Sequence, residues 1–320
     1  MQFYEHKFKC LGTTVTIKFW QPVGLLAQEV MQLVINQFMR FQETYSRFLP
    51  TSKLSKVNAH FADPEKEKKP IKVDSEFAAI LTRALKLAEY SNGAFDPTIY
   101  DLLVAHGYEN SFNAKEIQEK ADPARADGLA KTRPTWQEVT LQVGKQEGSY
   151  NLTLAANQKL DFGGIGKGWV IDLAAVIFRK YQVENFLIDA GGDISGAGTD
   201  LFTEKPWQID LALTLPNQEP KYLHYYLNIS GESVACSGVS ARRAGKFHHL
   251  LDPKTGQPVN EVWQTFISAP DATTADTLTT LLSIMGPDSV DKLCQDFKVE
   301  AMYVAAEGKL YASDNFRLTN

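Results

Sequence analysis

Residues 161–169 have the sequence DFGGIGKGW, the most unusual local composition in this chain of 320 residues. Its glycines let backbone N–H groups come close to a bound anion. The helix predicted to follow, to about Tyr181, presents the positive end of its dipole at the same place, and Lys167 adds a cation. A phosphate-bearing ligand fits all three features, whereas a tight strand-to-helix turn without a ligand is the alternative interpretation.

This stretch matches neither of the two common nucleotide-binding motifs. A P-loop requires a glycine where Asp161 stands, and a serine or threonine where Gly168 follows Lys167. The dinucleotide pattern G-x-G-x-x-G also fails, because the third glycine comes one residue early. The expectation of a phosphate therefore depends on the backbone and the lysine alone.

Periodicity on both sides of the glycine stretch predicts a mixture of strands and helices. Lys9–Trp20 alternates and is rich in β-branched residues, which is typical of a strand. Apolar residues recur at helical spacing in three segments, Leu25–Thr44, Ser75–Ser91 and Thr274–Met285. No regular βαβ rhythm is present, so we predict an α+β fold. We expect a single compact domain over residues 1–320, with a mixed, largely antiparallel sheet packed with helices and a polar surface excursion at about 106–134.

The composition excludes several classes of protein. A hydrophobic fraction of 44% in a chain of this length allows a large core. Lys plus Arg number 33 against 38 Asp plus Glu, a net charge of -5, which argues against nucleic acid as the main partner. No apolar run is long enough to span a bilayer. The N-terminus carries no signal-peptide pattern, so we predict a cytoplasmic protein, an exported form being possible if a leader was removed.

Two further glycine clusters follow predicted strands. One is Asp189-Ala190-Gly191-Gly192-Asp193, and the other is Ser237-Gly238. Each alone is more often a plain turn than a binding loop. Together with the glycine stretch, they predict a pocket lined by backbone, which is what a dinucleotide needs.

Asp276 and Thr280 are four residues apart on the last of the predicted helices, so their side chains lie on one face. A carboxylate and a hydroxyl are a plausible partial shell for Mg²⁺, which prefers oxygen and keeps waters or substrate phosphates as its other ligands. The alternative is that Asp276 caps the helix and Thr280 bonds back to the backbone.

Two other segments combine a chemically active side chain with a turn. His248 and His249 precede Asp252-Pro253-Lys254-Thr255-Gly256, a tight-turn sequence. A histidine there can act as a general base or donate to a phosphate, or it can simply be a hydrogen-bonded structural residue. Adjacent histidines in a strand point to opposite faces, so at most one would face a site. Phe95-Asp96-Pro97-Thr98 is a similar element with an acid.

Taken together, these segments resemble the ApbE family of FAD:protein FMN transferases, in the family's order and over nearly the whole chain. The matching segments are Leu11–Thr13, Ser46–Asn58, Gly93–Thr98, Leu160–Gly168, Asp189–Asp193, Cys236–Gly238, His249–Gly256 and Ala275–Thr280. Their combination in this order favours the functional interpretation of each over the structural one.

The resemblance implies a role for each candidate residue. Mg²⁺ would be held by Asp276, Thr280 and the backbone carbonyl of Gly166, which stands where the family usually has Ala. Lys167 and the surrounding amides, including that of Gly164, would hold the FAD diphosphate. The flavin pocket would be lined by Asp96, Gly191, Gly192, Ser237 and Gly238, with Cys236 where the family usually has Thr. His249 would also contact the flavin nucleotide and is the candidate for assisting the acceptor hydroxyl.

The implied reaction is transfer of FMN from FAD, the substrate, to a Thr or Ser hydroxyl of an acceptor flavoprotein, with release of AMP. Mg²⁺ and Lys167 would reduce the repulsion between the diphosphate and the incoming oxygen. Lys167, Asp276 and His249 are therefore the predicted catalytic residues. Two alternatives stay open: a Mg²⁺-dependent FAD pyrophosphatase that gives FMN and AMP, and a non-catalytic FAD-binding protein.

Overall fold

The structure is a computed structural model that describes residues 1–21, 24–63, 65, 69–109, 113–216, 223–239, 244 and 248–319. The chain divides into two compact units. The first comprises Met1–Gln42, Ile165–Ser240 and Asn260–Asn320, and the second comprises Glu43–Gly164 and Ala241–Val259. The glycine stretch passes from the second unit to the first at Gly164. The expectation of a single domain over residues 1–320 is not tested by this division into units and stays a prediction.

The first unit is built on two antiparallel sheets. The larger has the strand order β1-β2-β6-β7-β11-β12-β13-β14 and the smaller has the order β15-β10-β9-β8. The strands are β1 (Gln2–Cys10), β2 (Thr13–Gln21), β6 (Asn185–Ala190), β7 (Ile194–Ala197), β8 (Thr199–Asp200), β9 (Lys205–Leu213), β10 (Leu223–Ile229), β11 (Glu232–Gly238), β12 (Val262–Ala269), β13 (Glu300–Ala305), β14 (Leu310–Ala312) and β15 (Leu318–Thr319).

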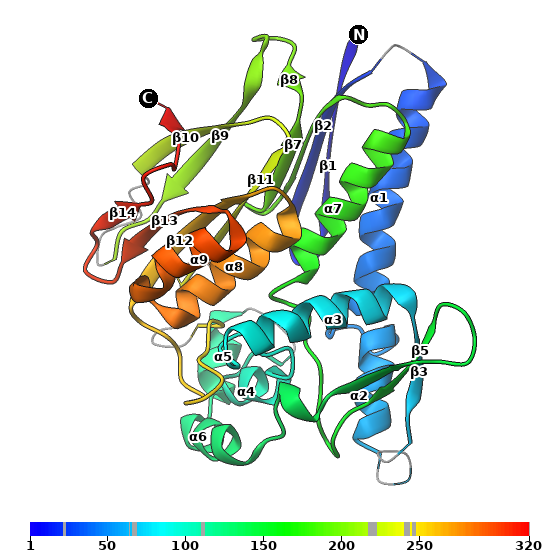
Figure 1. The fold of residues 1–320 in the computed structure, drawn as a ribbon, viewed down its shortest axis with the longest axis vertical. Helices are drawn as coiled ribbons and strands as arrows, with labels where there is room; N and C mark the ends of the chain where they lie inside the picture. The colour runs from blue at the N-terminus through cyan, green and yellow to red at the C-terminus, as the bar shows by residue number, and fades with distance from the viewer. Residues whose placement is uncertain are drawn as a thin grey trace. The chain divides into compact units, whose positions relative to one another are not determined.

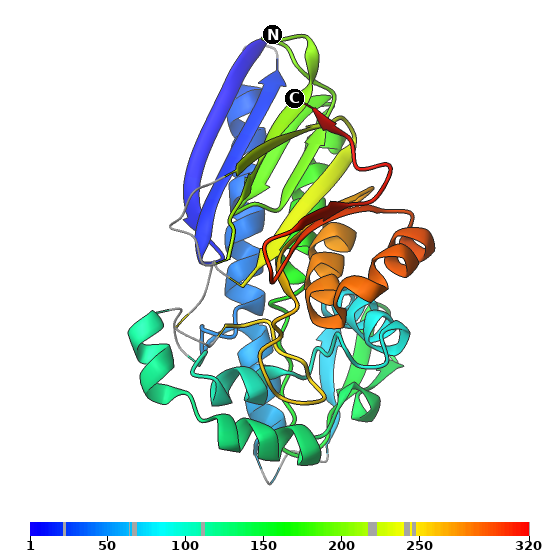
Figure 2. The same ribbon diagram turned by 90° about the vertical axis from the view of Figure 1, so that its left-hand side faces the viewer.

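An apolar core joins the two sheets of the first unit. Side chains from the larger sheet, such as Val234 and Phe266, cluster with Trp207, Ile209 and Leu227 of the smaller one. Helices lie on the opposite face of the larger sheet, as Figures 1 and 2 show for α1 (Leu25–Tyr45), α7 (Gly166–Lys180), α8 (Ala272–Met285) and α9 (Val290–Phe297), which the 3₁₀ helix η2 (Pro287–Ser289) precedes. The larger sheet therefore has both faces covered, by helices on one and strands on the other.

Strand β2 shows why the sequence folds this way. Val15, Ile17 and Phe19 alternate with polar residues and are fully buried. On the helical side, the Phe19 ring contacts that of Phe178 on α7, with centroids 5.2 Å apart. The alternating pattern of β2 and the helical spacing of α7 thus each place an aromatic ring at this apolar contact.

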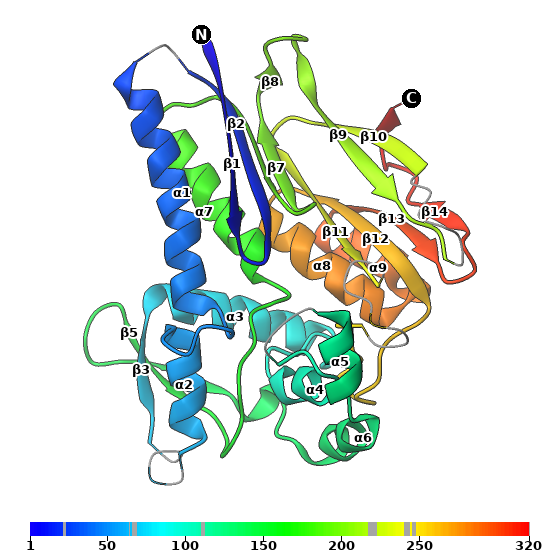
Figure 3. The same ribbon diagram turned by 180° about the vertical axis from the view of Figure 1, so that it is seen from behind.

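The second unit combines helices with a three-stranded antiparallel sheet of order β3-β5-β4, visible from behind in Figure 3. Its elements are α2 (Lys53–Phe61), β3 (Ile71–Asp74), α3 (Ser75–Tyr90), α4 (Tyr100–Ala105), α5 (Ala114–Lys120), α6 (Pro123–Thr132), the 3₁₀ helix η1 (Trp136–Glu138), β4 (Thr140–Val143) and β5 (Ser149–Thr153). One of its apolar clusters joins α4 to Ile117, Ala126 and Leu251.

The α+β class and the antiparallel sheets confirm the fold class predicted from the sequence. The single strand predicted over Lys9–Trp20 is wrong, because Leu11 and Gly12 adopt positive φ angles of 54° and 71° and form the turn of the β1–β2 hairpin. The predicted polar excursion at about 106–134 contains α5 and α6; its residues 110–112 lie outside the described residues. Among the described residues, no helix combines the length and apolar character that crossing a bilayer requires.

Candidate functional site

The glycine stretch opens α7. Ile165 occupies the N-cap position, and its own side chain makes no capping hydrogen bond. Gly166 is buried, and a Cβ there would lie 3.2 Å from the Phe41 ring. Because the first N–H groups of a helix have no intrahelical partner, the start of α7 offers donors to an anion.

The start of α8, which packs beside α7, is closed by two carboxylates. Asp271 caps it by accepting a hydrogen bond from the backbone N–H of Thr274 at 2.7 Å. Asp172 on α7 accepts from the backbone N–H groups of Ala272 and Thr273, both at 2.9 Å. Burial raises the pKa of the Asp172 carboxyl, against the opposing effect of these hydrogen bonds. The backbone N–H groups of Ala272, Thr273 and Thr274 at the start of α8 are thus bonded to carboxylates.

Gly168 fixes the distance between α7 and α8. A Cβ at this position would lie 2.3 Å from the carbonyl oxygen of Ala272 and 2.7 Å from the Cα of Thr273. Only glycine fits this approach without a shift of backbone. The backbone N–H of Gly168 then donates to Oδ2 of Asp276 at 3.0 Å. The predicted acid and the predicted glycine loop are thus in direct contact.

Lys167 lies between two buried carboxylates. Its Nζ forms a close ion pair with Asp193 and lies 3.8 Å from Oδ1 of Asp276. The side chains of Asp193 and Asp276 are 1% and 4% exposed, and that of Lys167 is 20% exposed. Burial raises the pKa of Asp193 to about 7; the Lys167 ammonium opposes this rise and the charge of Asp276 adds to it. We call these three residues the acidic cluster; with both acids ionised, it carries more negative than positive charge.

Hydroxyl groups on α8 show where Thr280 differs from its neighbours. Thr277, Thr279 and Ser283 each donate to a carbonyl of the preceding turn, at 2.7 to 2.8 Å. The half-buried Thr280 makes no such bond with the residues that the structure describes. Since Asp271 caps this helix, neither the capping role for Asp276 nor the back-bonding role for Thr280 is observed.

The other glycine clusters meet the acidic cluster in the first unit. Gly191 and Gly192 form the β6–β7 turn with φ angles of 72° and 95°, and Asp193 directly follows them. The side chain of Asp193 accepts from the backbone N–H of Cys236 at 3.4 Å. Ser237 donates to the Thr279 hydroxyl at 2.9 Å, and Gly238 ends β11. The three predicted glycine clusters are therefore brought to one place.

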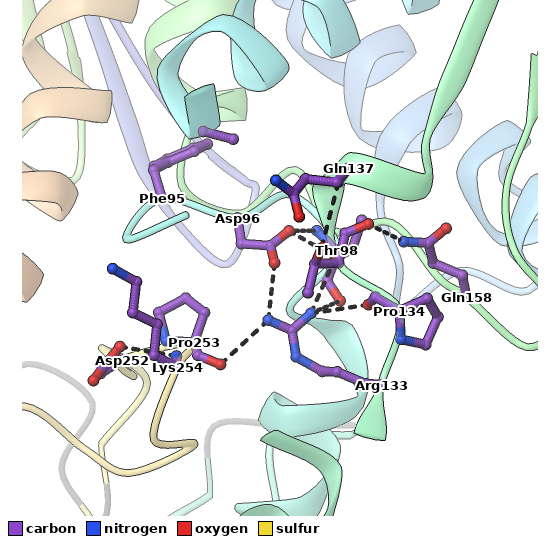
Figure 4. A network of polar contacts seen from close by, with 12 residues as sticks. Phe95, Asp96, Thr98, Arg133, Pro134, Gln137, Gln158, Asp252, Pro253 and Lys254 are labelled. Atoms are coloured by element: carbon purple, nitrogen blue, oxygen red, sulfur yellow. Dashed lines mark hydrogen bonds and ion pairs between the residues drawn. The ribbon is translucent and has the colours of Figure 1, made fainter. Parts of the chain in front are cut away.

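The remaining predicted residues, Asp96, Gly164 and His249, belong to the second unit. Asp96 is buried and accepts three hydrogen bonds, from the backbone and hydroxyl of Thr98 and from Arg133 (Figure 4). His248 is buried and His249 half-buried, with the His249 ring 6.4 Å from that of Tyr108. Neither histidine lies in a strand, so the expectation of opposite strand faces is wrong. The flavin-contacting roles of Asp96, Gly164 and His249 stay predictions.

Sequence reasoning assigned no role to several residues that shape these regions. Asp193 was part of a glycine cluster, and its position directly after two glycines is the signal that could have singled it out. Asp172 lies one helical turn after Gly168, the spacing that places both on the α8 side of α7. Arg133 carries no comparable signal, because it stands in a polar stretch among other charges.

The acidic cluster also limits what kind of metal site is possible. Within the described residues, no group of three or more His, Cys, Asp or Glu side chains suited to a metal is present. A cation bound beside Asp276 would have to complete its shell with neutral oxygens and with ligand oxygens. Hard cations accept such a shell, whereas zinc sites are usually built from His and Cys.

A glycine-rich helix start with a lysine beside it is typical of the class of proteins that bind phosphate-bearing ligands. A family model narrows the class: residues 11–303 match that of the ApbE family, and the chain belongs to this family.

Relatives and solved structures agree with this assignment. The chain is 26% identical over 293 residues to the FAD:protein FMN transferase of Haemophilus influenzae, covering 88% of this chain and 80% of the relative. It is 29% identical to the FAD:protein FMN transferase of Treponema pallidum, covering 76% and 69%. The crystal structure of the ApbE protein of Thermotoga maritima superposes with a TM-score of 0.81 at 28% identity, covering 98% of both chains. The flavin transferase ApbE of Vibrio cholerae shares the fold, with a TM-score of 0.82 at 21% identity and 98% coverage of both chains.

Proposed function

We propose that this protein is an FAD:protein FMN transferase that moves the FMN half of FAD to a Thr or Ser hydroxyl of an acceptor flavoprotein and releases AMP. One observation carries the proposal. The carboxylate of Asp276 lies 3.0 Å from the backbone N–H of Gly168, although 108 residues separate them in the chain. An acid thereby stands at the start of a glycine-rich helix, where a diphosphate would bind.

The residues around Asp276 fit a magnesium ion. Asp276 supplies a carboxylate, Thr280 a hydroxyl that is not committed to a described partner, and Gly166 a backbone carbonyl. This all-oxygen set leaves room for phosphate oxygens, as Mg²⁺ sites usually do. When bound, Mg²⁺ would neutralise charge on the diphosphate and on the departing AMP.

The protein's own groups have distinct tasks in the proposed reaction. The start of α7 and the Lys167 ammonium bind and orient the diphosphate. The acceptor oxygen forms a bond to the FMN-side phosphorus, the bond from that phosphorus to the bridging oxygen breaks, and AMP leaves with this oxygen. The proton of the acceptor hydroxyl goes to a base, for which His249 is the candidate. Asp193 holds the Lys167 ammonium in place.

The test is incubation of the protein with FAD, MgCl₂ and a candidate acceptor domain, followed by mass spectrometry of the intact acceptor. We expect a mass gain equal to FMN, an equal amount of AMP, and loss of both when EDTA replaces MgCl₂. The matched control is an acceptor in which the modified Thr or Ser is replaced by Ala. Free FMN with no adduct would favour the pyrophosphatase, and retention of intact FAD would favour a binding protein.

A further inference from the structure

A buried arginine is the centre of a hydrogen-bond network in the second unit (Figure 4). Arg133 ends α6, and its side chain is 5% exposed. Its Nη2 lies 2.8 Å from Oδ2 of Asp96, whose side chain is 1% exposed. Its Nη1 donates to the hydroxyl of Thr98 at 3.0 Å. We call Asp96, Thr98 and Arg133 the arginine cluster.

The arginine cluster contacts one chain segment that carries predicted site residues, and Pro97, which lies between two of its members, contacts a second. Nη2 of Arg133 also donates to the carbonyl oxygen of Pro253, at 3.4 Å. On the other side, the carbonyl of Pro97 accepts from the backbone N–H of Asp161 at 2.8 Å. The first contact reaches the turn that follows His249, and the second reaches the start of the glycine stretch.

The turn that Arg133 contacts belongs to a short hairpin. The backbone N–H of Val259 donates to Leu250 at 3.1 Å, and that of Gly256 donates to Asp252 at 2.8 Å. His249 directly precedes this hairpin. The tip is also contacted by His106, whose Nε2 lies 2.6 Å from the carbonyl oxygen of Gly256. Two buried side chains therefore contact the tip, at Pro253 and at Gly256.

We propose that Arg133 is a positioning residue, which fixes the hairpin at 250–259 and thereby the place of His249. A guanidinium suits this task because its planar fork can bind a carboxylate and a carbonyl at once in fixed geometry. A lysine in its place keeps the charge opposite Asp96 but offers no such fork. The kinetic part of this inference rests on the proposed function; the structural part does not.

The experiment compares the full-length protein with Arg133→Lys and Arg133→Gln. Arg125→Gln is the matched control, since Arg125 is an exposed arginine of the same helix. Hydrogen exchange, followed by mass spectrometry without FAD, reports on peptides from the hairpin and from α8. We expect exchange of the hairpin amides to rise about tenfold or more in Arg133→Lys, with α8 unchanged, because a lost tether raises local opening.

The kinetic readout separates positioning from general loss of stability. Because misplacing a participating group slows the chemical step, we expect kcat for FMN transfer to fall about tenfold in Arg133→Gln while KM for FAD changes less than about threefold. Arg133→Lys should recover part of kcat, and Arg125→Gln should match the parent protein.

Unchanged hairpin exchange in Arg133→Lys would overturn the inference, as would a parent-like kcat in Arg133→Gln. If Arg133→Gln does not fold, hairpin exchange in Arg133→Lys still tests the inference. If the parent protein shows no transfer at all, the proposed function fails, while the exchange comparison still tests the hold of Arg133 on the hairpin.

Discussion

The acidic cluster of the first unit and the arginine cluster of the second are both buried, but their charges are matched differently. In the arginine cluster, one guanidinium meets one carboxylate, and both oxygens of Asp96 accept hydrogen bonds. In the acidic cluster, one ammonium is shared by two carboxylates and remains partly exposed. The charges of the arginine cluster are thus matched one to one, whereas the acidic cluster, with both acids ionised, has a surplus of negative charge that a cation or a positively charged group could compensate.

The largest expected effect concerns the arginine cluster. Asp96→Ala leaves a buried guanidinium without its counter-charge, so we expect the free energy of unfolding to fall by about 3 to 5 kcal/mol. Urea denaturation measures this. Glu119→Ala, which breaks the exposed pair with Lys115 on α5, is the control. A loss for Asp96→Ala as small as that of Glu119→Ala would mean that the two clusters do not differ as described.

The acidic cluster should respond in activity rather than in stability. Asp276→Asn keeps an acceptor for the Gly168 N–H but removes the negative charge. We expect AMP release from FAD to slow by at least about 100-fold, as is usual when an electrostatic contact to the reacting groups is lost. The exposed Asp291→Asn on α9 is the control. AMP release at the parent rate in Asp276→Asn would remove this acid from the mechanism.

The packing of α7 on α8 can be tested by a pair of glycine substitutions. In Gly168→Ala, the new methyl would meet the Ala272 backbone, so we expect a loss of about 1 to 3 kcal/mol in unfolding free energy. In Gly128→Ala on α6, nothing lies within 4 Å of the new methyl. There we expect a gain of about 0.4 to 1 kcal/mol. Thermal denaturation of both variants checks the opposite signs; equal signs would contradict the close helix approach.

The smallest effect concerns pH and His106. Burial lowers the pKa of His106 below its ordinary value of 6.5, against the raising effects of the Gly256 carbonyl and of Asp127. The unfolded chain therefore takes up a proton at higher pH than the folded protein, and stability falls as pH drops below 6.5.

His106→Gln keeps an N–H donor for Gly256 but cannot titrate. Urea denaturation at pH 7.5 and 5.5 should show a weaker pH dependence for this variant, by at most about 1.4 kcal/mol per pH unit. An identical pH dependence in the two proteins would exclude this role for His106.

The sequence predicted the elements with strong periodicity. The helices expected at Leu25–Thr44 and Ser75–Ser91 correspond to α1 and α3 within one residue at each end. The part of strand β1 before Lys9 was missed, because it is an edge strand whose charged residues leave little alternation. Local patterns do not report which distant segments meet.

In the candidate site too, the sequence predicted what depends on local spacing but not what depends on contacts between distant segments. Asp276 and Thr280 share a helix face, which their spacing of four residues predicts. The contact between Asp276 and Gly168 depends on the packing of α7 against α8, and only the family resemblance anticipated it. Arg133 was not anticipated, because its function depends entirely on the partners that the fold brings to it.

The start of α7, which Asp276 contacts through the Gly168 N–H, ties ligand binding to the thermal behaviour of the protein. A side-chain cap is typically worth about 0.5 to 2 kcal/mol to a helix; Asp271 supplies one at α8, whereas Ile165 supplies none at α7. An anion bound at the start of α7 would act as the cap that Ile165 does not supply, so nucleotide should protect the first turn of this helix against fraying. The same binding energy then raises the melting temperature as nucleotide concentration rises.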